Sequence, residues 1–268
     1  MTGNRRVVYH MPVPCENNFS KGASRMKRLT RISASLSVAI LLTLAVSAPR
    51  LWSSEKAHQI PSEPAATPLA QAGETLSKLM NGNQHFVSGQ PAQKDIGTIR
   101  RTELVKGQTP SAVVLSCSDS RVPPELIFNQ GLGDIFVVRV AGNVADPVAL
   151  GSIEYAVEHL HVPLIIVMGH DRCDAVAATL KGGKPEGNIR AIVRKIAPAV
   201  KKAKISGKKG DALLDAAVIE NVWTVTADLA RESKIVKHLM NEGKLRIVAA
   251  KYSLETGKVE LLEPAKNR

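Results

Sequence analysis

Three short apolar runs, rich in β-branched residues, constrain the fold of this chain more than any other feature of its sequence. They cover residues 112–116, 135–140 and 163–168. Strands that are apolar on both faces are typical of a parallel sheet covered by helices on both sides. Helical patterns lie between and after these runs, at 124–128, 147–160, 173–180, 188–203 and 211–240. The alternation predicts one α/β domain with a mostly parallel central β-sheet flanked by helices.

The chain ends in two further apolar segments of strand length, at 245–253 and 259–262. Glu255-Thr-Gly257 lies between them and contains a glycine, which is typical of a hairpin connection. We therefore expect the last two strands to pair as a hairpin. The folded domain that we expect, from near Leu69 to the end of the chain, spans about 200 residues, which is the size of a single domain.

The N-terminal quarter is organised differently from this domain. From Met26 the sequence reads Met-Lys-Arg-Leu-Thr-Arg and continues into the uncharged stretch 32–48. A basic and then an apolar segment is the layout of a secretory signal, and 17 uncharged residues also reach the lower limit for spanning a membrane. We therefore assign 1–25 to an upstream extension, 26–57 to a signal peptide or membrane anchor, 58–70 to a Pro/Ala-rich linker and 71–268 to the folded domain. This organisation predicts a periplasmic or otherwise exported protein, bound to the membrane only if the segment stays uncleaved.

The net charge of +12 does not indicate a nucleic-acid partner, because residues 1–50 alone contribute +7. A second basic region covers 181–210, where ten Lys and Arg face the single acid Glu186. Apolar residues there are spaced for one helix face: Ile189, Ile192, Val193, Ile196 and Val200. This spacing predicts an amphipathic helix with a solvated basic side. Binding to an anionic membrane or to a partner is the alternative for this region.

Potential metal ligands follow two of the predicted strands. Cys117 directly follows the first run, and His170 and Cys173 follow the third, more than 50 residues later. Adjacent parallel strands would bring the three together at the carboxyl edge of the sheet, where sites of α/β proteins lie. Two thiolates and one imidazole suit a zinc ion with one open position. The alternatives are that the cysteines are small buried apolar residues or form a Cys117–Cys173 disulfide in an oxidising compartment.

The polar residues beside Cys117 favour a site over these alternatives. Asp119 and Arg121 are costly at a strand end unless they pair with each other or serve a site. At this point the sequence resembles the β-class carbonic anhydrases, and the resemblance runs from 79–86 (LMNGNQHF) to the 254–257 turn. The matching motifs, in order, are Cys117-Ser-Asp119-Ser-Arg121, Gly133-Asp-Ile-Phe136-Val-Val-Arg139, Ala141-Gly-Asn143, Ser152-Ile-Glu-Tyr155 and Gly169-His170-x-x-Cys173.

The resemblance implies a zinc enzyme that interconverts carbon dioxide and bicarbonate by attack of a zinc-bound hydroxide, in a homodimer or higher homo-oligomer. Cys117, His170 and Cys173 would hold one Zn²⁺ per chain. Asp119 and Arg121 would form a catalytic dyad, with Asp119 becoming a fourth ligand in a closed form only. The residues implied for the substrate pocket are Gln108, Phe136 and Tyr155.

One departure from the family pattern lies beside the metal ligands. Asp174 stands where family members usually have glycine, and its carboxylate could cap the following helix. Two other functions stay open at this stage. One is a related zinc hydrolase that acts on another small heterocumulene such as carbon disulfide. The other is a non-catalytic zinc-binding protein that retains the fold.

Overall fold

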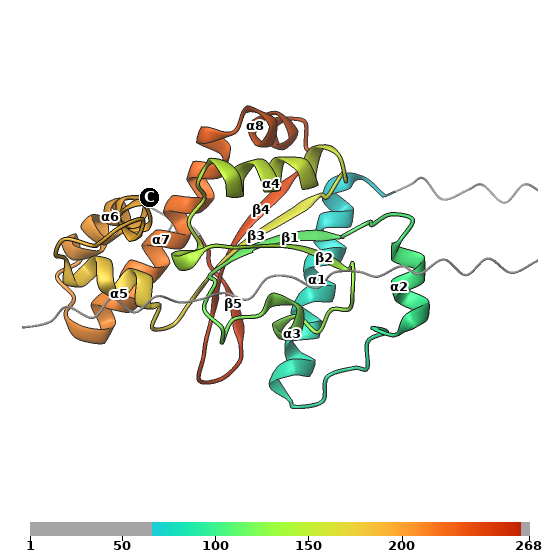
Figure 1. Cartoon of the computed structure of the whole chain (residues 1–268), viewed down its shortest axis with the longest axis horizontal. Coiled ribbons are helices and arrows are strands. Elements are labelled where there is room, and N and C mark those ends of the chain that lie inside the picture. The colour runs from blue at the N-terminus through green and yellow to red at the C-terminus, as the bar shows by residue number, and fades with distance from the viewer. Residues whose placement is uncertain (1–65, 264–268) are drawn as a thin grey trace, which may run out of the picture. The chain divides into compact units, whose positions relative to one another are not determined.

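The computed structural model describes residues 66–263, and its centre is a five-stranded sheet (Figure 1). The strands lie in the order β2-β1-β3-β4-β5, so β1, which leads into Cys117, lies directly beside β3, which ends at His170. The first four strands are parallel and β5 pairs antiparallel with β4, which confirms the mostly parallel sheet and the terminal hairpin. The strands are β1 (Ala112–Ser116), β2 (Ile135–Arg139), β3 (Leu164–His170), β4 (Arg246–Tyr252) and β5 (Val259–Leu261).

Helices cover both faces of this sheet, as the wholly buried strands β1 and β3 require. Side chains from α4, α7 and α8 pack on one face, around Ile153, Val222 and Leu229. Side chains from α1 and α3 pack on the other, around Leu79 and Phe128. The helices are α1 (Pro68–Val87), α2 (Thr98–Leu104), α3 (Pro124–Ile127), the 3₁₀ turn η1 (Ala141–Asn143), α4 (Pro147–Glu158), α5 (Asp174–Lys181), α6 (Ile189–Ile205), α7 (Gly210–Glu232) and α8 (Lys234–Asn241).

The helices of the structure differ from the sequence predictions in three ways. The segment 211–240 is two helices, because Ser233 adopts an extended backbone and accepts a hydrogen bond from the Val236 amide as the N-cap of α8. The helices α1 and α2 were not predicted. Since α1 begins at Pro68, capped by Thr67, the last three residues assigned to the 58–70 linker are helical.

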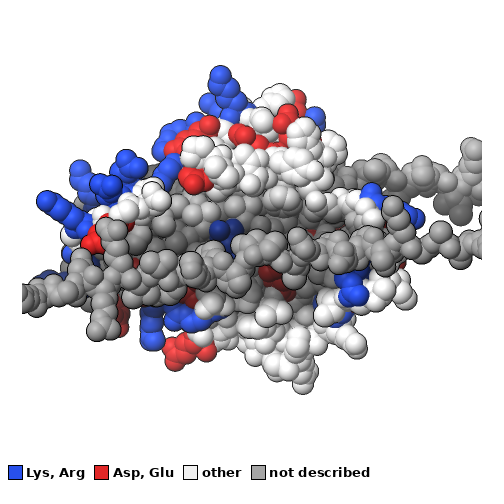
Figure 2. Space-filling model, in the orientation of Figure 1, with Lys and Arg blue, Asp and Glu red and all other residues white. Residues whose placement is uncertain are grey.

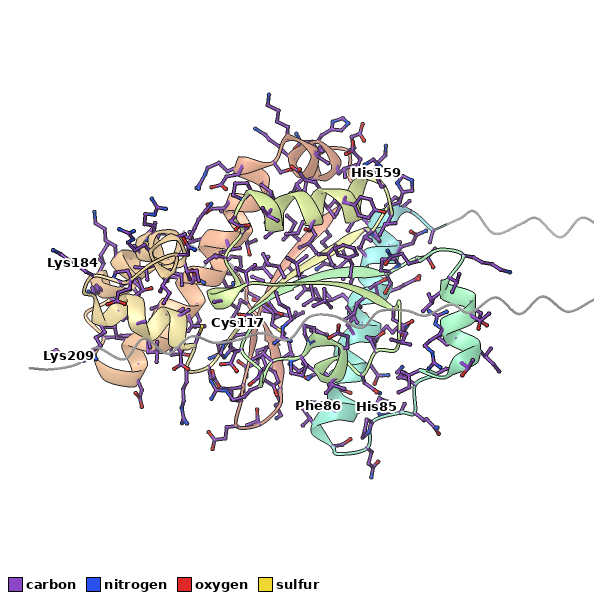
Figure 3. All side chains as sticks on the ribbon, in the orientation of Figure 1. His85, Phe86, Cys117, His159, Lys184 and Lys209 are labelled. Carbon is purple, nitrogen blue, oxygen red and sulfur yellow. The ribbon has the colours of Figure 1, made fainter. Side chains whose placement is uncertain are left out.

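The basic region 181–210 forms α6 and its flanking loops, and α6 is amphipathic as expected. Its buried side includes Ile196 and Val200, while most Lys and Arg are exposed. Figure 2 shows these cations gathered at the end of the domain where α6 lies, and Figure 3 shows Lys184 and Lys209 there. Ile189 was expected on the buried side but is 57% exposed, because it is the first residue of the helix.

The assignments for 1–25, 26–57 and most of 58–70 lie outside the described residues. Within 66–263, none of the helices is both long and apolar enough to cross a membrane. The signal-peptide or anchor assignment therefore stays a prediction from sequence.

Candidate metal centre

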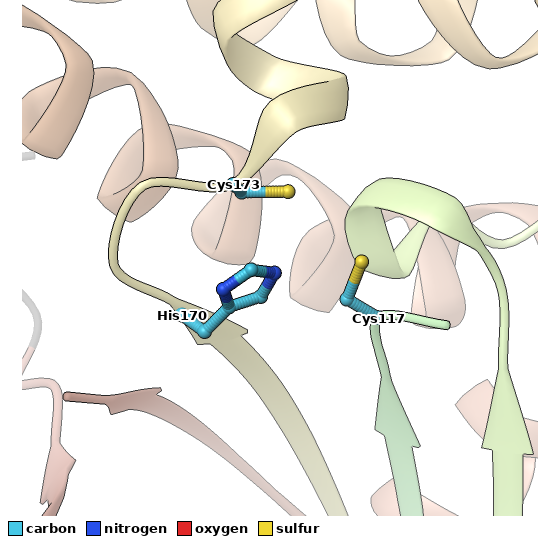
Figure 4. A group of neighbouring side chains, drawn as sticks. All are labelled: Cys117, His170 and Cys173. Atoms are coloured by element: carbon cyan, nitrogen blue, oxygen red, sulfur yellow. The ribbon is translucent and has the colours of Figure 1, made fainter. Parts of the chain in front are cut away.

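Three potential metal ligands meet at the carboxyl edge of the sheet. Cys117 follows β1, His170 is the last residue of β3, and Cys173 immediately precedes α5. One ligand atom from each lies within 4.8 Å of the others, and all three residues are buried. Figure 4 shows the two sulfur atoms and the imidazole ring facing one space. The adjacency of β1 and β3 thus joins two motifs that are far apart in the sequence.

The turn between β3 and α5 determines how His170 presents its ring. The Nδ1 atom lies 2.8 Å from the Asp171 carbonyl oxygen, which can only accept a hydrogen bond. The ring must therefore carry its proton on Nδ1, and Nε2 keeps a free lone pair. Nε2 is buried without a hydrogen-bond partner among the described residues. An orphaned nitrogen between two thiols is the arrangement expected of a histidine that ligates a metal.

The two thiols are inequivalent. Cys117 Sγ accepts hydrogen bonds from the Gly142 amide at 3.2 Å and the Asp119 amide at 3.4 Å. The hydrogen bond from Cys173, with those from the two amides, holds the pKa of the Cys117 thiol well below its usual value, against the opposing effect of burial. Donation to Cys117 and burial raise the pKa of the Cys173 thiol. The chain therefore favours a thiolate at Cys117.

This donor set fits Zn²⁺. Sulfur and imidazole nitrogen are zinc ligands, and three protein ligands with one open position define a catalytic rather than a structural zinc site. Both cysteines are free in the structure, so the disulfide alternative does not describe it. Both cysteines also belong to the apolar cluster around Val176 and Ile196, and it is their convergence on His170 that distinguishes a ligand pair from apolar packing.

Asp119 and Arg121 lie beside the ligands as an ion pair. Arg121 donates from Nη2 to Asp119 Oδ2 at 2.6 Å, from Nε to Oδ1 at 3.0 Å and from its amide to Oδ1 at 2.9 Å. These bonds hold the pKa of the Asp119 carboxyl well below its usual range. Oδ2 also lies 3.9 Å from His170 Nε2. The carboxylate therefore stays ionised and adjoins the metal ligands while Arg121 binds it.

Asp174 is the first residue of α5 and is exposed to solvent. The N-cap of α5 is Cys173 and not Asp174, so the structure does not show the capping role considered for this carboxylate. Its negative charge contributes to a raised pKa of Arg121, after the larger effect of the Asp119 hydrogen bond. Asp174 therefore acts on the dyad through charge, as a second anion near Arg121.

Gln108, Phe136 and Tyr155 do not lie with the three ligands in this chain. Gln108 precedes β1 and lines an open hollow with Val105 and Gly133, at the opposite end of the strand from Cys117. Phe136 and Tyr155 face each other, with ring centroids 6.4 Å apart, and the tyrosine is 48% exposed. One chain alone therefore does not bring these three residues to the zinc ligands, as their predicted roles in the substrate pocket would require.

Three residues that sequence reasoning gave no role support the Cys117 loop. Arg139 donates to the carbonyl oxygens of Cys117 at 3.0 Å and Asp119 at 2.5 Å. The buried Asn221 of α7 donates to the Gly142 carbonyl at 2.8 Å, while the Gly142 amide donates to Cys117. Arg139 could have been found as a charge at the end of an apolar strand. The sequence contains no comparable signal for Asn221.

The fold and centre together define an α/β protein with a candidate zinc site of the open, catalytic type. Residues 112–259 match the family model described as carbonic anhydrase. A carbonic anhydrase of Mycolicibacterium smegmatis is 44% identical over 187 residues, which cover 68% of this chain and 89% of the relative. Carbonic anhydrase 2 of Mycobacterium tuberculosis is 42% identical over 187 residues, which again cover 68% of this chain and 89% of the relative. The chain belongs to the carbonic anhydrase family.

Solved structures place it in the β class of that family. The Coccomyxa β-carbonic anhydrase, solved in complex with acetazolamide, superposes with a TM-score of 0.58 and 30% identity, covering 70% of this chain and 86% of that one. The β-carbonic anhydrase CcaA gives a TM-score of 0.57 and 27% identity, covering 73% and 94%. These matches confirm the predicted fold and family.

Proposed function

We propose that this chain is a carbonic anhydrase that hydrates carbon dioxide reversibly at a zinc ion held by Cys117, His170 and Cys173. The observation that carries the proposal is the convergence of these three buried donors beside an ionised carboxylate that already has a cationic partner. A purely structural zinc site would close its fourth position with another protein ligand.

The residues around the centre have separate tasks in this reaction. When bound, zinc makes a coordinated water acidic enough to supply a nucleophile near neutral pH. Asp119, being ionised, can only accept hydrogen bonds, so it orients the attacking oxygen by accepting its proton in a hydrogen bond. Arg121 holds that carboxylate at both oxygens and keeps it from turning toward the metal ligands. Arg139 holds the backbone of Cys117 and Asp119 in place.

A homodimer is proposed to complete the substrate pocket. Gln108 and Tyr155 are exposed and lie away from the chain's own zinc ligands, so a second copy would have to bring such residues to the centre. Analytical ultracentrifugation of the purified protein would test this. We expect a dimer or a larger even-numbered assembly, and a catalytically active monomer would contradict it.

Export is a further part of the proposal and rests on the sequence alone. The basic segment from Met26 followed by the uncharged stretch 32–48 supports a secretory signal or anchor. Fractionation of cells that express the full chain, with N-terminal sequencing of the product, would test it. Recovery of the uncleaved chain in the cytoplasm would contradict it.

Zinc analysis and stopped-flow hydration of carbon dioxide test the central proposal together. We expect one zinc per chain, lost with the activity in Cys173→Ser, because serine is not a usual zinc ligand. The control is His85→Ala, which changes an exposed histidine of α1. Full zinc content in Cys173→Ser would refute the ligand assignment. The same preparation assayed with carbon disulfide distinguishes the heterocumulene alternative, and zinc binding without either activity would indicate the non-catalytic one.

A further inference from the structure

The turn that carries His170 and Cys173 is tied to the rest of the domain by one largely buried lysine. Lys251, on β4, has a side chain only 16% exposed. Its Nζ lies 3.4 Å from Asp171 Oδ1 in the turn and 2.7 Å from Asp215 Oδ1 on α7. Burial acts to lower the pKa of Lys251, but the hydrogen bond and charge of Asp215, with the charge of Asp171, raise it above the usual value. The ammonium group therefore links the turn to α7.

Asp171 is the residue through which this link reaches the metal ligands. Its carbonyl oxygen lies 2.8 Å from His170 Nδ1 and so determines the orientation of the ring. Its amide donates to the Tyr252 carbonyl at 3.0 Å, and its carboxylate pairs with Lys251. Adjacent residues of β4 thus hold both the backbone and the side chain of Asp171.

The turn needs such support because its own backbone does not favour the observed conformation. Arg172 has a φ of 51°, a left-handed conformation that is uncommon for residues other than glycine. That conformation reverses the chain between His170 and Cys173, so both can face one space. An arginine offers no intrinsic preference for it, and the surrounding contacts must supply the stabilisation.

The other end of the link is also fixed. Helix α7 approaches β3 closely at Gly169, where an added Cβ would lie 2.6 Å from Val222 Cγ2. Gly169 pairs with Lys251 in the sheet register. Asp215 therefore belongs to a helix that cannot shift toward or away from β3 without disturbing this contact.

We propose that Lys251 is a positioning residue for the zinc centre, which it serves by holding Asp171 so that the Asp171 carbonyl orients His170. The inference rests on the proposed zinc function and adds a residue to it that touches neither metal nor substrate. Outer-shell partners of this kind typically change metal affinity by 10- to 100-fold when they are removed. The pairs are partly exposed, so we expect the lower end of that range, an approximately tenfold weaker affinity.

The test measures zinc affinity of the full chain by competition with a chelator, alongside hydration activity. Lys251→Met keeps the length of the side chain and removes its charge, so it should bind zinc about tenfold more weakly. Lys251→Arg should restore most of the affinity. The matched control is Lys244→Met, which removes an ion pair of 2.9 Å with Glu242 near the start of β4 and should leave affinity unchanged.

A second measurement separates positioning from general stability. In ¹⁵N-histidine-labelled, zinc-loaded protein, the His170 Nδ1 proton should exchange slowly with solvent in the wild type. It should exchange faster in Lys251→Met but not in Lys244→Met. If Lys251→Met does not fold, Asp171→Asn serves instead, because it keeps the carbonyl and the size of the side chain while removing the ion pair.

The outcomes distinguish this inference from the proposed function. Wild-type affinity and slow exchange in both Lys251→Met and Asp171→Asn, in a chain that binds zinc and hydrates carbon dioxide, would overturn the inference and leave the function standing. A wild-type chain that binds no zinc would overturn both. Weaker affinity with faster exchange, rescued by arginine, would establish the positioning role.

Discussion

Arg121→Ala is the variant that most directly tests how the dyad works. It removes two charge-assisted hydrogen bonds to Asp119, at 2.6 and 3.0 Å, and leaves the backbone bond at 2.9 Å. The arginine side chain is 51% exposed, so solvent screens the pair and its direct contribution to stability is small. Its effect on catalysis comes from holding Asp119 in its productive orientation beside the metal ligands. Loss of such an outer-shell partner typically lowers activity 10- to 100-fold, so we expect the hydration rate to fall roughly 10- to 100-fold.

Zinc content should not change in this variant, because neither dyad residue is among the three ligands. Stopped-flow hydration and metal analysis on the same preparation measure both quantities. The matched control is Arg231→Ala on α7, which removes an ion pair of the same 2.6 Å length to Asp228, also with a mostly buried carboxylate. If Arg121→Ala hydrates carbon dioxide at the wild-type rate, the dyad has no catalytic role and is a structural ion pair.

The same variant has a defined pH dependence of stability. Arg121 lowers the pKa of Asp119 in the folded state below the unfolded value of about 3.9. The pair therefore stabilises the fold fully above that pH and loses its contribution as the pH falls toward the folded pKa. Thermal unfolding should show Arg121→Ala less stable than the wild type at pH 7, with the difference shrinking below about pH 4. A difference that grows in acid would contradict the assigned direction.

Three further variants test the contacts and buried charge of α7. Gly169→Ala should destabilise the fold by about 1–3 kcal/mol in denaturant unfolding, since its methyl group would lie 2.6 Å from Val222; an unchanged midpoint would contradict this. Asn221→Ala should cost about 1–3 kcal/mol and weaken zinc binding, because the buried Gly142 carbonyl loses its partner; wild-type stability would refute it. Burial raises the pKa of Asp228 in the folded state, so the wild-type fold loses stability as the pH rises through that pKa. The stability of Asp228→Asn relative to the wild type should therefore be higher at pH 7 than at pH 3. Calorimetry at the two pH values checks the sign.

The sheet and the ligand set were predictable because local sequence controls them. A strand buried on both faces must be apolar throughout, and β1 and β3 are buried at every position. A metal ligand at the end of such a strand stands out as a polar residue next to an apolar run. If β1 and β3 are neighbours, as the structure shows them to be, their parallel pairing places Cys117 beside His170.

The supporting residues were not predictable because contacts distant in sequence determine them. Ser233 ends α7 and caps α8, and its hydroxyl donates to Glu154 at 2.5 Å, from a helix that lies 79 residues earlier. Asn221 and Asp215 look like ordinary polar positions of a helix until α7 is packed against the sheet. Their roles follow from which side of α7 faces η1 and β4, and periodicity alone does not give that choice.

The substrate pocket marks a different limit, because its residues match the family pattern but one chain does not assemble them. Phe136 is paired with Val113 in the sheet, four residues before Cys117, and packs toward the α4 face. Gln108 lies beyond the opposite end of β1. A match to a family motif indicates the role of a residue, but it does not indicate whether the residue acts in its own chain or in a second copy.

The zinc ligands, the dyad and the Lys251 link are all contained within one chain, whereas the proposed pocket depends on assembly. Metal binding should therefore tolerate dissociation into monomers better than catalysis does, and zinc content and hydration rate measured across a dilution series would separate the two; zinc lost in parallel with activity would show that assembly also supports the metal site.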